Sequence, residues 1–523
     1  MRTFVASIVL SIAALGQGLD PAKLLKPPTD TWPTYNGDYS GRRYSTLSQI
    51  NSSNVKNLRL AWMYRLAPGP EGIVGNGQIK STPLEINGVL YFTVPDHVWA
   101  VDARTGRELW HYRWESKGGI HIGNRGVGVY ENWLFFETPD CHLVSLNMKD
   151  GKERWNKEVC DLDQEYYASV APIVIRNHVM VGVSGDDLDI PGYIESRDPE
   201  TGELQWRFYT EPRPGEPGSE TWPSADAMIH GGGMTWVPST YDPELNLMYF
   251  GTGNPQPVLA GKGREGDNLY TESIVALNPD TGKLAWYFQP SPHDTHDWDA
   301  VQTPVLFDGI WKGQKRKMVA QASRNGYFFV LDRTNGQHLL TTPFIKTNWA
   351  SGIDAKGRPI RNKAKDPSPD GTLVSPASDG ASNWPPPSYN PDTGMLYVSA
   401  HRAYSVFYLT DLEDKPEGWG GVDRSVYSES YLQAIDYKTG KVTWSHHWPS
   451  GSGLSGWLST AGKLLFGGDP AGNFLAFDPE NGNLLWHTRL NMNISNGPMT
   501  YELDGVQYLV VGANDLLLAF TLP

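Results

Sequence analysis

Cysteine is almost absent from this chain of 523 residues, which contains only Cys141 and Cys160. So few cysteines exclude a fold built on disulfides, and neither lies in a CxxC pair or a CxxCH haem-attachment motif. A cysteine-rich zinc site and covalently bound haem are therefore excluded. If the chain carries out a redox reaction, its electrons must leave through another protein.

Basic residues are also scarce, with 44 Lys and Arg against 58 Asp and Glu, so the formal net charge at pH 7 is −14. A negative chain repels phosphate backbones, and no basic stripe with interleaved aromatic residues offsets this repulsion. After residue 20, no stretch approaches the roughly 20 apolar residues that cross a bilayer. The sequence argues against nucleic-acid binding and against an integral membrane span in the mature chain.

The amino terminus has the pattern of an export signal. Arg2 precedes an apolar run over residues 4–15, and small residues follow the run. This order predicts a secretory signal peptide over residues 1–18 and a mature domain over residues 19–523, which is periplasmic or secreted. An uncleaved membrane anchor is the alternative, and the shortness of the run disfavours it.

Aromatic and turn-forming residues are plentiful: 20 Trp, 25 Tyr and 16 Phe occur beside 55 Gly and 39 Pro. This composition favours strands and tight turns over a helical bundle. One pattern recurs, in which a short apolar stretch and an Asp or Asn lead into a Gly-containing turn and then a strand that usually carries Trp. It occupies residues 100–110, 145–155, 196–206, 276–286, 330–340, 434–444 and 476–486. Each copy predicts a β-hairpin, because its Gly can adopt a positive φ.

The two ends of the chain complete this repeat. A strand around Trp62 has no hairpin before it, and the strands at residues 508–522 have no tryptophan strand after them. Pairing of these ends would remove the open edge of a ring, and repeats of about 40 to 50 residues suit four-stranded blades. We therefore predict an all-β fold: a single eight-bladed β-propeller, closed by N- and C-terminal strands, with tryptophans packed between blades.

Cys141 and Cys160 lie on the two strands of the second hairpin, and its turn brings them opposite each other. This placement permits a disulfide in an exported protein, with free thiols as the alternative.

Three polar clusters lie outside the repeats, at residues 183–189, 251–257 and 291–299. Carboxylate and amide oxygens are hard ligands that suit Ca²⁺ or a larger oxygen-seeking cation. Taken singly, each cluster is also typical of a loop, because Asp caps turns and Asn254 precedes a proline. The pair His293 and His296 suggests zinc, but acidic neighbours favour hydrogen-bonded loop histidines.

These clusters belong to an ordered set of motifs. The set comprises an entry segment (32–62), NRG (124–126), SGDD (184–187), GGGMTWVPSTYDP (231–243), GTGNP (251–255), PHDTHDWD (292–299), SRNGYFFVLDR (323–333) and GPMTYELDGVQYLVV (497–511). In these motifs the chain resembles the pyrroloquinoline quinone (PQQ) dependent alcohol dehydrogenases, the quinoprotein methanol and ethanol dehydrogenase group. The resemblance covers essentially the full mature length.

The resemblance implies PQQ as the cofactor, together with Ca²⁺ or a lanthanide ion. The implied metal ligands are Asp187, where the family has Glu, and Asn254, Asp297 and Asp299. Asp297 also matches the aspartate proposed as catalytic base in the family. Asp299 matches an additional Asp of lanthanide-using members, but similar spacing occurs in relatives thought to use divalent ions, so both kinds of ion stay open.

The resemblance also implies a cofactor pocket with cations for the acidic groups and an aromatic floor for the ring. The implied cofactor-binding residues are Lys80, Arg125, Ser169, Ser184, Gly185, Trp236 and Arg324. Lys80 stands where the family has Glu, so a cofactor contact and a solvated lysine are both open.

Other positions depart from the family. Its adjacent-cysteine pair should fall near Gly119 and Ile120, where there is no cysteine. Met234, His401 and Leu454 replace a Thr, an Asn and a Trp. The roof and edges of the pocket are thus remodelled, and primary alcohol, polyol and sugar all remain open as substrates.

The predicted function is an exported dehydrogenase that oxidises an alcohol, polyol or sugar by metal-assisted hydride transfer to PQQ. Its electrons are expected to pass to a separate cytochrome c-type acceptor. The alternative is a non-catalytic propeller of the same repeat family that acts as an envelope assembly scaffold. Scaffolds of that kind lack the ordered metal, base and arginine set. A sugar-binding lectin would need exposed aromatic residues at repeated loop positions, which the sequence does not show.

Overall fold

The computed structural model describes residues 18–66, 77–185, 189–448 and 455–523. The predicted signal peptide, apart from Gly18, lies outside these ranges, as do the predicted metal ligand Asp187 and Leu454. Strands dominate the described residues, which confirms the predicted all-β class. No helix among them is long and apolar enough to cross a membrane.

In the part of the chain that the structure describes, five sheets each contain four strands that follow one another in sequence. They are β3 (Leu84–Ile86), β4 (Val89–Val94), β5 (His97–Asp102) and β6 (Glu108–Arg113); β7 (Gly128–Tyr130), β8 (Trp133–Glu137), β9 (His142–Asn147) and β10 (Glu153–Glu158); β11 (Ile173–Ile175), β12 (His178–Gly182), β13 (Tyr193–Arg197) and β14 (Leu204–Tyr209); β15 (Thr240–Asp242), β16 (Leu247–Gly251), β17 (Ile274–Leu277) and β18 (Leu284–Phe288); and β19 (Val305–Trp311), β20 (Gln314–Ala322), β21 (Tyr327–Asp332) and β22 (His338–Pro343). The repeat hairpins supply the last two strands of each sheet.

Three further sheets bring together segments that are more distant in sequence. They are β25 (Thr372–Val374), β27 (Met395–Leu409), β28 (Gly421–Asp436) and β29 (Val442–Trp448), with β26 (Ser388–Asn390) on β27; β1 (Tyr44–Ser45), β30 (Leu458–Thr460), β31 (Leu464–Gly468), β32 (Asn473–Phe477) and β33 (Leu484–Arg489); and β2 (Arg59–Arg65), β36 (Leu516–Thr521), β35 (Val506–Ala513) and β34 (Met499–Leu503). A small ladder joins β23 (Ala350–Ile353) to β24 (Pro359–Arg361).

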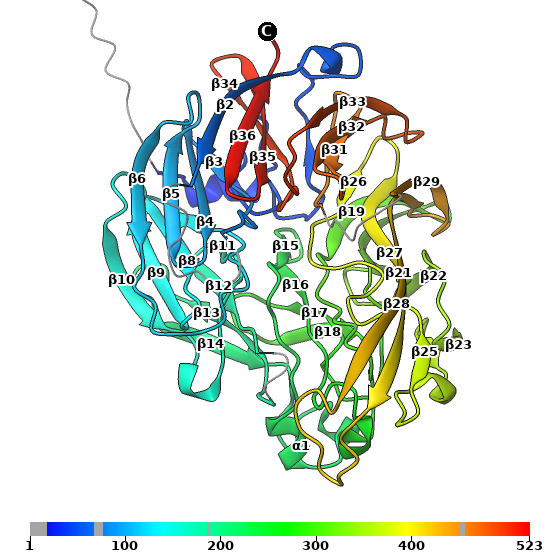
Figure 1. Ribbon diagram of the computed structural model, residues 1–523. Helices are drawn as coiled ribbons and strands as arrows, with labels where there is room; N and C mark the ends of the chain where they lie inside the picture. The colour runs from blue at the N-terminus through cyan, green and yellow to red at the C-terminus, as the bar shows by residue number, and fades with distance from the viewer. Residues whose placement is uncertain (1–17, 67–76, 186–188, 449–454) are drawn as a thin grey trace, which may run out of the picture.

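Helices are few and short in the described residues. They are α1 (Ala225–Ile229) and the 3₁₀ turns η1 (Pro21–Leu25), η2 (Val55–Asn57), η3 (Leu162–Gln164), η4 (Ser219–Thr221), η5 (Gly261–Arg264) and η6 (Lys363–Lys365). Figure 1 shows the sheets following one another around the molecule, with the blue β2 beside the red β36. In that shared sheet Trp62 of β2 pairs with Ala519 of β36.

The repeat tryptophans pack against the next hairpin, as predicted. The indole Nε1 of Trp62 donates to the carbonyl of Ala103 at 3.1 Å, and Gly106 of the same turn adopts φ +70°. A Cβ on Gly106 would lie 2.5 Å from the Trp62 ring. The same pairing of indole and turn glycine recurs at Trp110 with Gly151, Trp155 with Gly202, Trp206 with Gly282, Trp286 with Gly336 and Trp444 with Gly482. Glycine is therefore needed there both for its backbone conformation and for the close approach of the ring.

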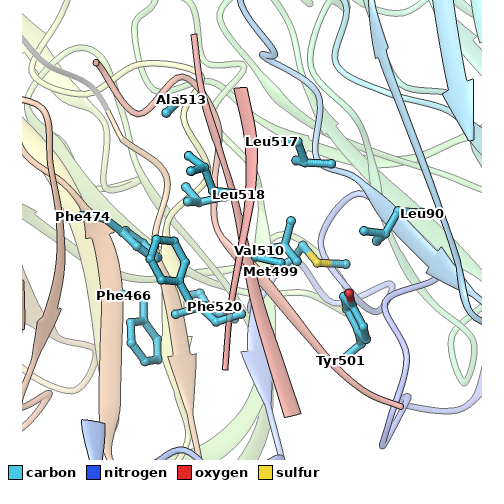
Figure 2. Close-up of a cluster of buried hydrophobic side chains, with 14 of the residues drawn as sticks. Leu90, Phe466, Phe474, Met499, Tyr501, Val510, Ala513, Leu517, Leu518 and Phe520 are labelled. Atoms are coloured by element: carbon cyan, nitrogen blue, oxygen red, sulfur yellow. The ribbon is translucent and has the colours of Figure 1, made fainter. Parts of the chain in front are cut away.

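Apolar side chains fill the spaces between adjacent sheets. In Figure 2, Phe520 of β36 lies beside Phe474 of β32, and their ring centroids are 5.6 Å apart. The same buried cluster includes Leu90 of β4, so it joins β34–β36 to the sheets on either side. Burial of one such side chain stabilises the fold by about 1.5–3 kcal/mol.

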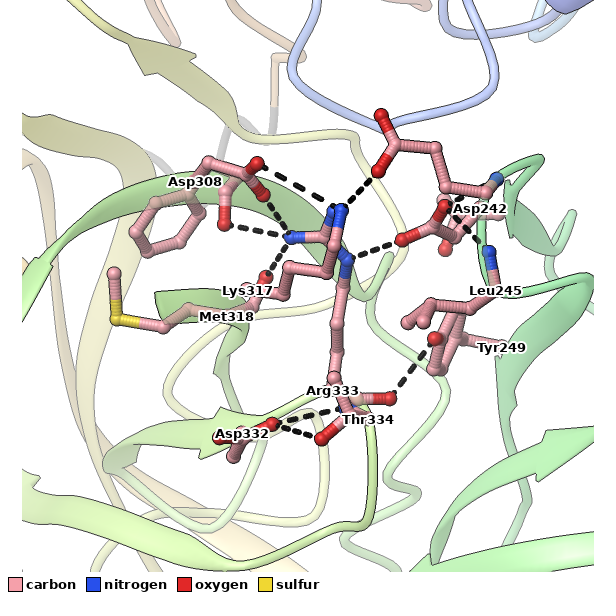
Figure 3. A network of polar contacts seen from close by, with 12 residues as sticks. Asp242, Leu245, Tyr249, Asp308, Lys317, Met318, Asp332, Arg333 and Thr334 are labelled. Atoms are coloured by element: carbon pink, nitrogen blue, oxygen red, sulfur yellow. Dashed lines mark hydrogen bonds and ion pairs between the residues drawn. The ribbon is translucent and has the colours of Figure 1, made fainter. Parts of the chain in front are cut away.

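A buried arginine forms ion pairs with residues of two different sheets. Arg333 donates from Nε to Oδ2 of Asp242 on β15 at 2.6 Å, and from Nη1 to Oδ1 of Asp308 on β19 at 2.6 Å (Figure 3). Its backbone carbonyl accepts hydrogen bonds from Tyr249 and Trp286.

Cys141 and Cys160 form a disulfide that links the residue just before β9 to the chain just after β10, so both cysteines lie just outside the strands on which they were expected. Of the two alternatives for this pair, a disulfide or free thiols, the structure shows the disulfide. The bridge closes a loop with a sequence separation of 19.

Candidate functional site

A buried arginine lies at the centre of the candidate site. Arg324, in the turn between β20 and β21, donates from Nη1 to Oδ2 of Asp299 at 2.7 Å and from Nη2 to Oδ2 of Asp297 at 2.9 Å. Nη2 also donates to the carbonyl of Ser378 at 2.7 Å. Burial opposes the charged form of Arg324, but the two carboxylates outweigh it and raise the pKa of the guanidinium above its ordinary value. The arginine therefore stays charged and holds both carboxylates in place.

Asp299 connects this arginine to two other predicted residues. Its Oδ2 accepts from Nε1 of Trp236 at 3.0 Å, and its Oδ1 accepts from the backbone N–H of Asn254 at 2.6 Å. The residue is only 1% exposed. Gly253 permits this approach, because a Cβ there would lie 3.1 Å from Oδ1 of Asp299.

The side-chain amide of Asn254 faces both carboxylates. One of its two terminal atoms lies 3.0 Å from Oδ1 of Asp299 and 3.2 Å from Oδ1 of Asp297. As nitrogen this atom donates to both carboxylates, whereas the amide oxygen in the same place completes a set of three oxygen ligands. The amide can thus serve either state of the site, with or without a cation.

These three side chains have the chemistry of a hard-cation site. They offer oxygen donors from two loops that are distant in sequence, a donor set that suits Ca²⁺ and lanthanide ions. Within the described ranges, no three His, Cys, Asp or Glu side chains are grouped to hold a metal ion. The fourth predicted ligand, Asp187, lies outside those ranges and stays a prediction.

A second group of predicted residues gathers around Arg125. Its Nη1 donates to Oγ of Ser169 at 2.7 Å, and that hydroxyl lies 3.3 Å from Oγ of Ser184. The guanidinium carbon lies 4.7 Å from the ring centroid of Trp236 and 5.4 Å from that of Trp384. Trp236 therefore contacts both groups, through its ring on one side and its Nε1 on the other.

Lys80 lies at the edge of this second group. Burial, and then the nearby charge of Arg125, lower the pKa of Lys80 to about 8. Its Nζ donates to the carbonyl of Ile122 at 2.6 Å. Two basic side chains, one of them stacked on aromatic rings, favour an acidic, flat ligand.

Two more regions named in the sequence analysis, the predicted rim and the predicted roof, contain residues that the structure describes. Gly185 adopts φ +143° and its carbonyl accepts from Gln256 at 3.4 Å. In the predicted roof segment, where the cysteine pair is missing, the side chains of Ile120 and Ile122 are each 48% exposed. His121 between them is held by Oδ2 of Asp96 at 2.7 Å.

The histidines of the third cluster contact backbone carbonyls. His293 lies 2.7 Å from the carbonyl of Gly266, and His296 lies 2.9 Å from that of Lys365. These contacts show that His293 and His296 are hydrogen-bonded loop histidines rather than zinc ligands.

Two residues near the site were missed by the sequence reasoning. Trp384 could have been noticed because it lies outside the repeats that explain most other tryptophans. Glu272, a buried acid beside Asn254, carries no motif signal, because a carboxylate just before an apolar strand is common in any β protein.

Comparison with known proteins identifies the family of this chain. Residues 32–346 match the PQQ family described as the β-propeller domain of glucose, ethanol and alcohol dehydrogenases. The quinoprotein alcohol dehydrogenase PedH of Pseudomonas putida is 37% identical, with 97% of this chain and 91% of that protein covered. The chain belongs to the PQQ-dependent alcohol dehydrogenases. The predicted family, enzyme class and β-propeller are thereby confirmed.

Solved structures also support the family assignment of this PQQ-dependent alcohol dehydrogenase. The quinohemoprotein alcohol dehydrogenase of Comamonas testosteroni superposes with a TM-score of 0.89 at 32% identity, covering 96% of this chain and 82% of that one. A europium-containing methanol dehydrogenase superposes with a TM-score of 0.85 at 28% identity, covering 96% and 99%. Residues 270–521 also match a model described as outer membrane protein assembly factor BamB.

Proposed function

We propose that this PQQ-dependent alcohol dehydrogenase is exported after removal of residues 1–18, and that residues 19–523 form one propeller of eight blades. Within the described ranges, eight sheets of four or five strands support this count. The sheet that contains both β2 and β34–β36 supports closure of the ring by the two ends of the chain.

The proposed site combines the two groups around Trp236. PQQ, when bound, supplies the acceptor for two electrons, and a cation beside it polarises the accepting carbonyl. Trp236 is the aromatic floor, while Lys80, Arg125 and Arg324 balance the acidic groups of the cofactor. The residues proposed at the rim are Ser169, Ser184 and Gly185, and those proposed to hold Ca²⁺ or a lanthanide ion are Asp187, Asn254, Asp297 and Asp299.

Asp297 is the proposed catalytic base. Its side chain is 14% exposed, against 1% for Asp299, although both pair with Arg324. A base must reach the substrate, so the more exposed carboxylate has this role and the enclosed one holds the site together. Asp297 accepts the hydroxyl proton of an alcohol as the carbon-bound hydrogen leaves with its electron pair.

The electrons pass one at a time to a separate cytochrome c-type protein in this proposal. The chain has neither Cys-based haem attachment nor another thiol pair for electron storage beyond its one disulfide. Its net charge of −14 favours a basic acceptor, with association that weakens as salt rises.

A non-catalytic envelope scaffold is the second candidate, and the match of residues 270–521 to BamB supports it. The contact of Arg324 with Asp297 and Asp299 favours the enzyme, because a scaffold has no use for a buried acid pair beside a tryptophan. This single arrangement is the observation that carries the proposed function.

Reconstitution tests the proposal. Purified protein, stripped of metal and cofactor, is mixed with PQQ and either Ca²⁺ or La³⁺, and dye reduction is followed with ethanol, glycerol and glucose. We expect cofactor binding and alcohol-dependent turnover with at least one ion. No PQQ binding with either ion would refute the enzyme and favour the scaffold.

Asp297→Asn tests the assignment of the base. We expect PQQ binding to persist while turnover falls by about 10²–10⁴-fold, because the proton acceptor is lost. Asp308→Asn is the matched control, since Asp308 also pairs with an arginine that bridges two aspartates. Normal turnover in Asp297→Asn would show that the base lies elsewhere.

A further inference from the structure

Glu272 is a buried acid beside the proposed cation site. It lies two residues before β17, and its backbone N–H donates to the carbonyl of Gly253 at 2.9 Å. Gly253 directly precedes Asn254, so the backbone of Glu272 runs alongside a proposed ligand loop. The residue is 0% exposed.

The carboxyl of Glu272 lacks the partners that buried acids ordinarily have. Among the described residues, neither of its oxygens has a hydrogen-bond partner. By contrast, the buried Glu85 accepts from Thr31 and from the backbone of Gly88. Leaving a buried polar group without a partner is costly, so such a group in a native fold points to a ligand or a charge that it serves.

The carboxyl of Glu272 is close enough to two proposed ligands, Asp297 and Asp299, to interact with their charges. Burial raises the pKa of Glu272 well above its ordinary value, and the nearby carboxylates of Asp294, Asp299 and Asp297 raise it further, while Arg324 opposes them. A second buried arginine, Arg264, also interacts with the charges of Asp294 and Glu272, so two arginines face four acids where no cation is bound.

We propose that Glu272 is a further acidic residue of the cation site, whose negative charge strengthens binding of a trivalent lanthanide ion more than that of Ca²⁺. This inference rests on the proposed function, because it requires a cation held by Asn254, Asp297 and Asp299. Glu272 acts on the ion through space, because no three acidic side chains in the described ranges are grouped to hold a metal ion, and its contribution grows with the charge of the ion. A bound cation supplies the positive charge that makes the ionised form of Glu272 favourable in a buried pocket.

Glu272→Gln tests the inference, because the amide has the shape of a neutral carboxyl but cannot ionise. In protein without cation or PQQ, we expect Tm to change little. Titration with La³⁺ and Ca²⁺, followed by calorimetry, is expected to show affinity losses on the order of 30-fold and 10-fold, since the effect on the logarithm of affinity scales with ionic charge as three to two. The matched control is Glu85→Gln, which is expected to leave both affinities unchanged.

The outcomes separate this inference from the proposed function. If the unaltered protein binds neither ion, the proposed cation site itself fails. If Glu272→Gln binds both ions as the unaltered protein does, or loses affinity equally for both, the inference is overturned. Should Glu272→Gln fail to fold, Glu272→Asp keeps the charge, and loss of the preference for La³⁺ in that variant would equally contradict the inference.

Discussion

Replacing Asp299 with Asn tests whether the Asp297–Arg324–Asp299 arrangement is a buried ionic unit. The substitution keeps the size of the side chain and removes its charge. It breaks the 2.7 Å pair with Nη1 of Arg324, while the 2.9 Å pair between Arg324 and Asp297 remains. It also replaces one carboxylate oxygen with an NH₂ group, at a position where either Trp236 or the backbone N–H of Asn254 donates a hydrogen bond.

The expected cost follows from burial. Breaking a buried ion pair by removing one partner destabilises a protein by about 3–5 kcal/mol. A chain of this length has an unfolding entropy of about 1 kcal/mol per kelvin, so the change corresponds to a fall in Tm of roughly 3–5 °C. Asp297→Asn is expected to cost less, because its side chain is 14% exposed against 1% for Asp299.

The assay is thermal unfolding of metal-free, PQQ-free protein, followed by titration with La³⁺ and Ca²⁺. Asp242→Asn provides the matched control, because Asp242 is 4% exposed and lies 2.6 Å from Nε of Arg333. We expect both variants to lose similar stability, but only Asp299→Asn to lose cation affinity, more for La³⁺ than for Ca²⁺. An unchanged Tm for Asp299→Asn, or equal cation affinity in the two variants, would refute the reasoning.

Two further predictions concern the frame around the site. Replacing both Cys141 and Cys160 with Ser is expected to lower the unfolding free energy by about 3 kcal/mol, because the bridge closes a loop with a separation of 19, and a Tm equal to that of the unaltered protein would contradict this. Burial lowers the pKa of His97 to about 4. The unfolded chain therefore takes up a proton near pH 6.5 that the folded chain does not bind, and the stability of the fold decreases as pH falls from 6.5 toward 4. His97→Gln is expected to recover about 2 kcal/mol of that loss, allowing for solvent screening, in denaturant unfolding at pH 4.5 and 7; an identical pH slope in the variant would rule the histidine out.

The repeat hairpins were predictable from sequence because their causes are local. Asp or Asn begins each turn, Gly takes the positive φ, and alternating apolar residues choose the buried face. The tryptophan that follows a turn packs against the turn glycine of the next repeat, as Trp62 packs against Gly106. A periodic sequence thus contains both halves of each contact between repeats.

The candidate site was predictable only as a set of motifs. Their order identified the family and therefore the residues to examine, including Asp297, Asp299 and Arg324. It did not indicate that Asp299 is the enclosed member of the acid pair, nor that Trp384 lies over Arg125. Exposure and ring contacts of this kind depend on which loops meet, and loops from different sheets carry no local signal of one another.

The sequence by itself determined the class of fold, the hairpin repeat and the membership of the PQQ-dependent alcohol dehydrogenases, because turn chemistry, strand alternation and motif order are properties of neighbouring residues. Only the tertiary structure decided that the two cysteines are bonded, that one arginine holds two aspartates, and that Glu272 is enclosed beside them without a hydrogen-bond partner among the described residues. Those outcomes depend on the distances between segments far apart in the chain, which the packing of whole sheets sets.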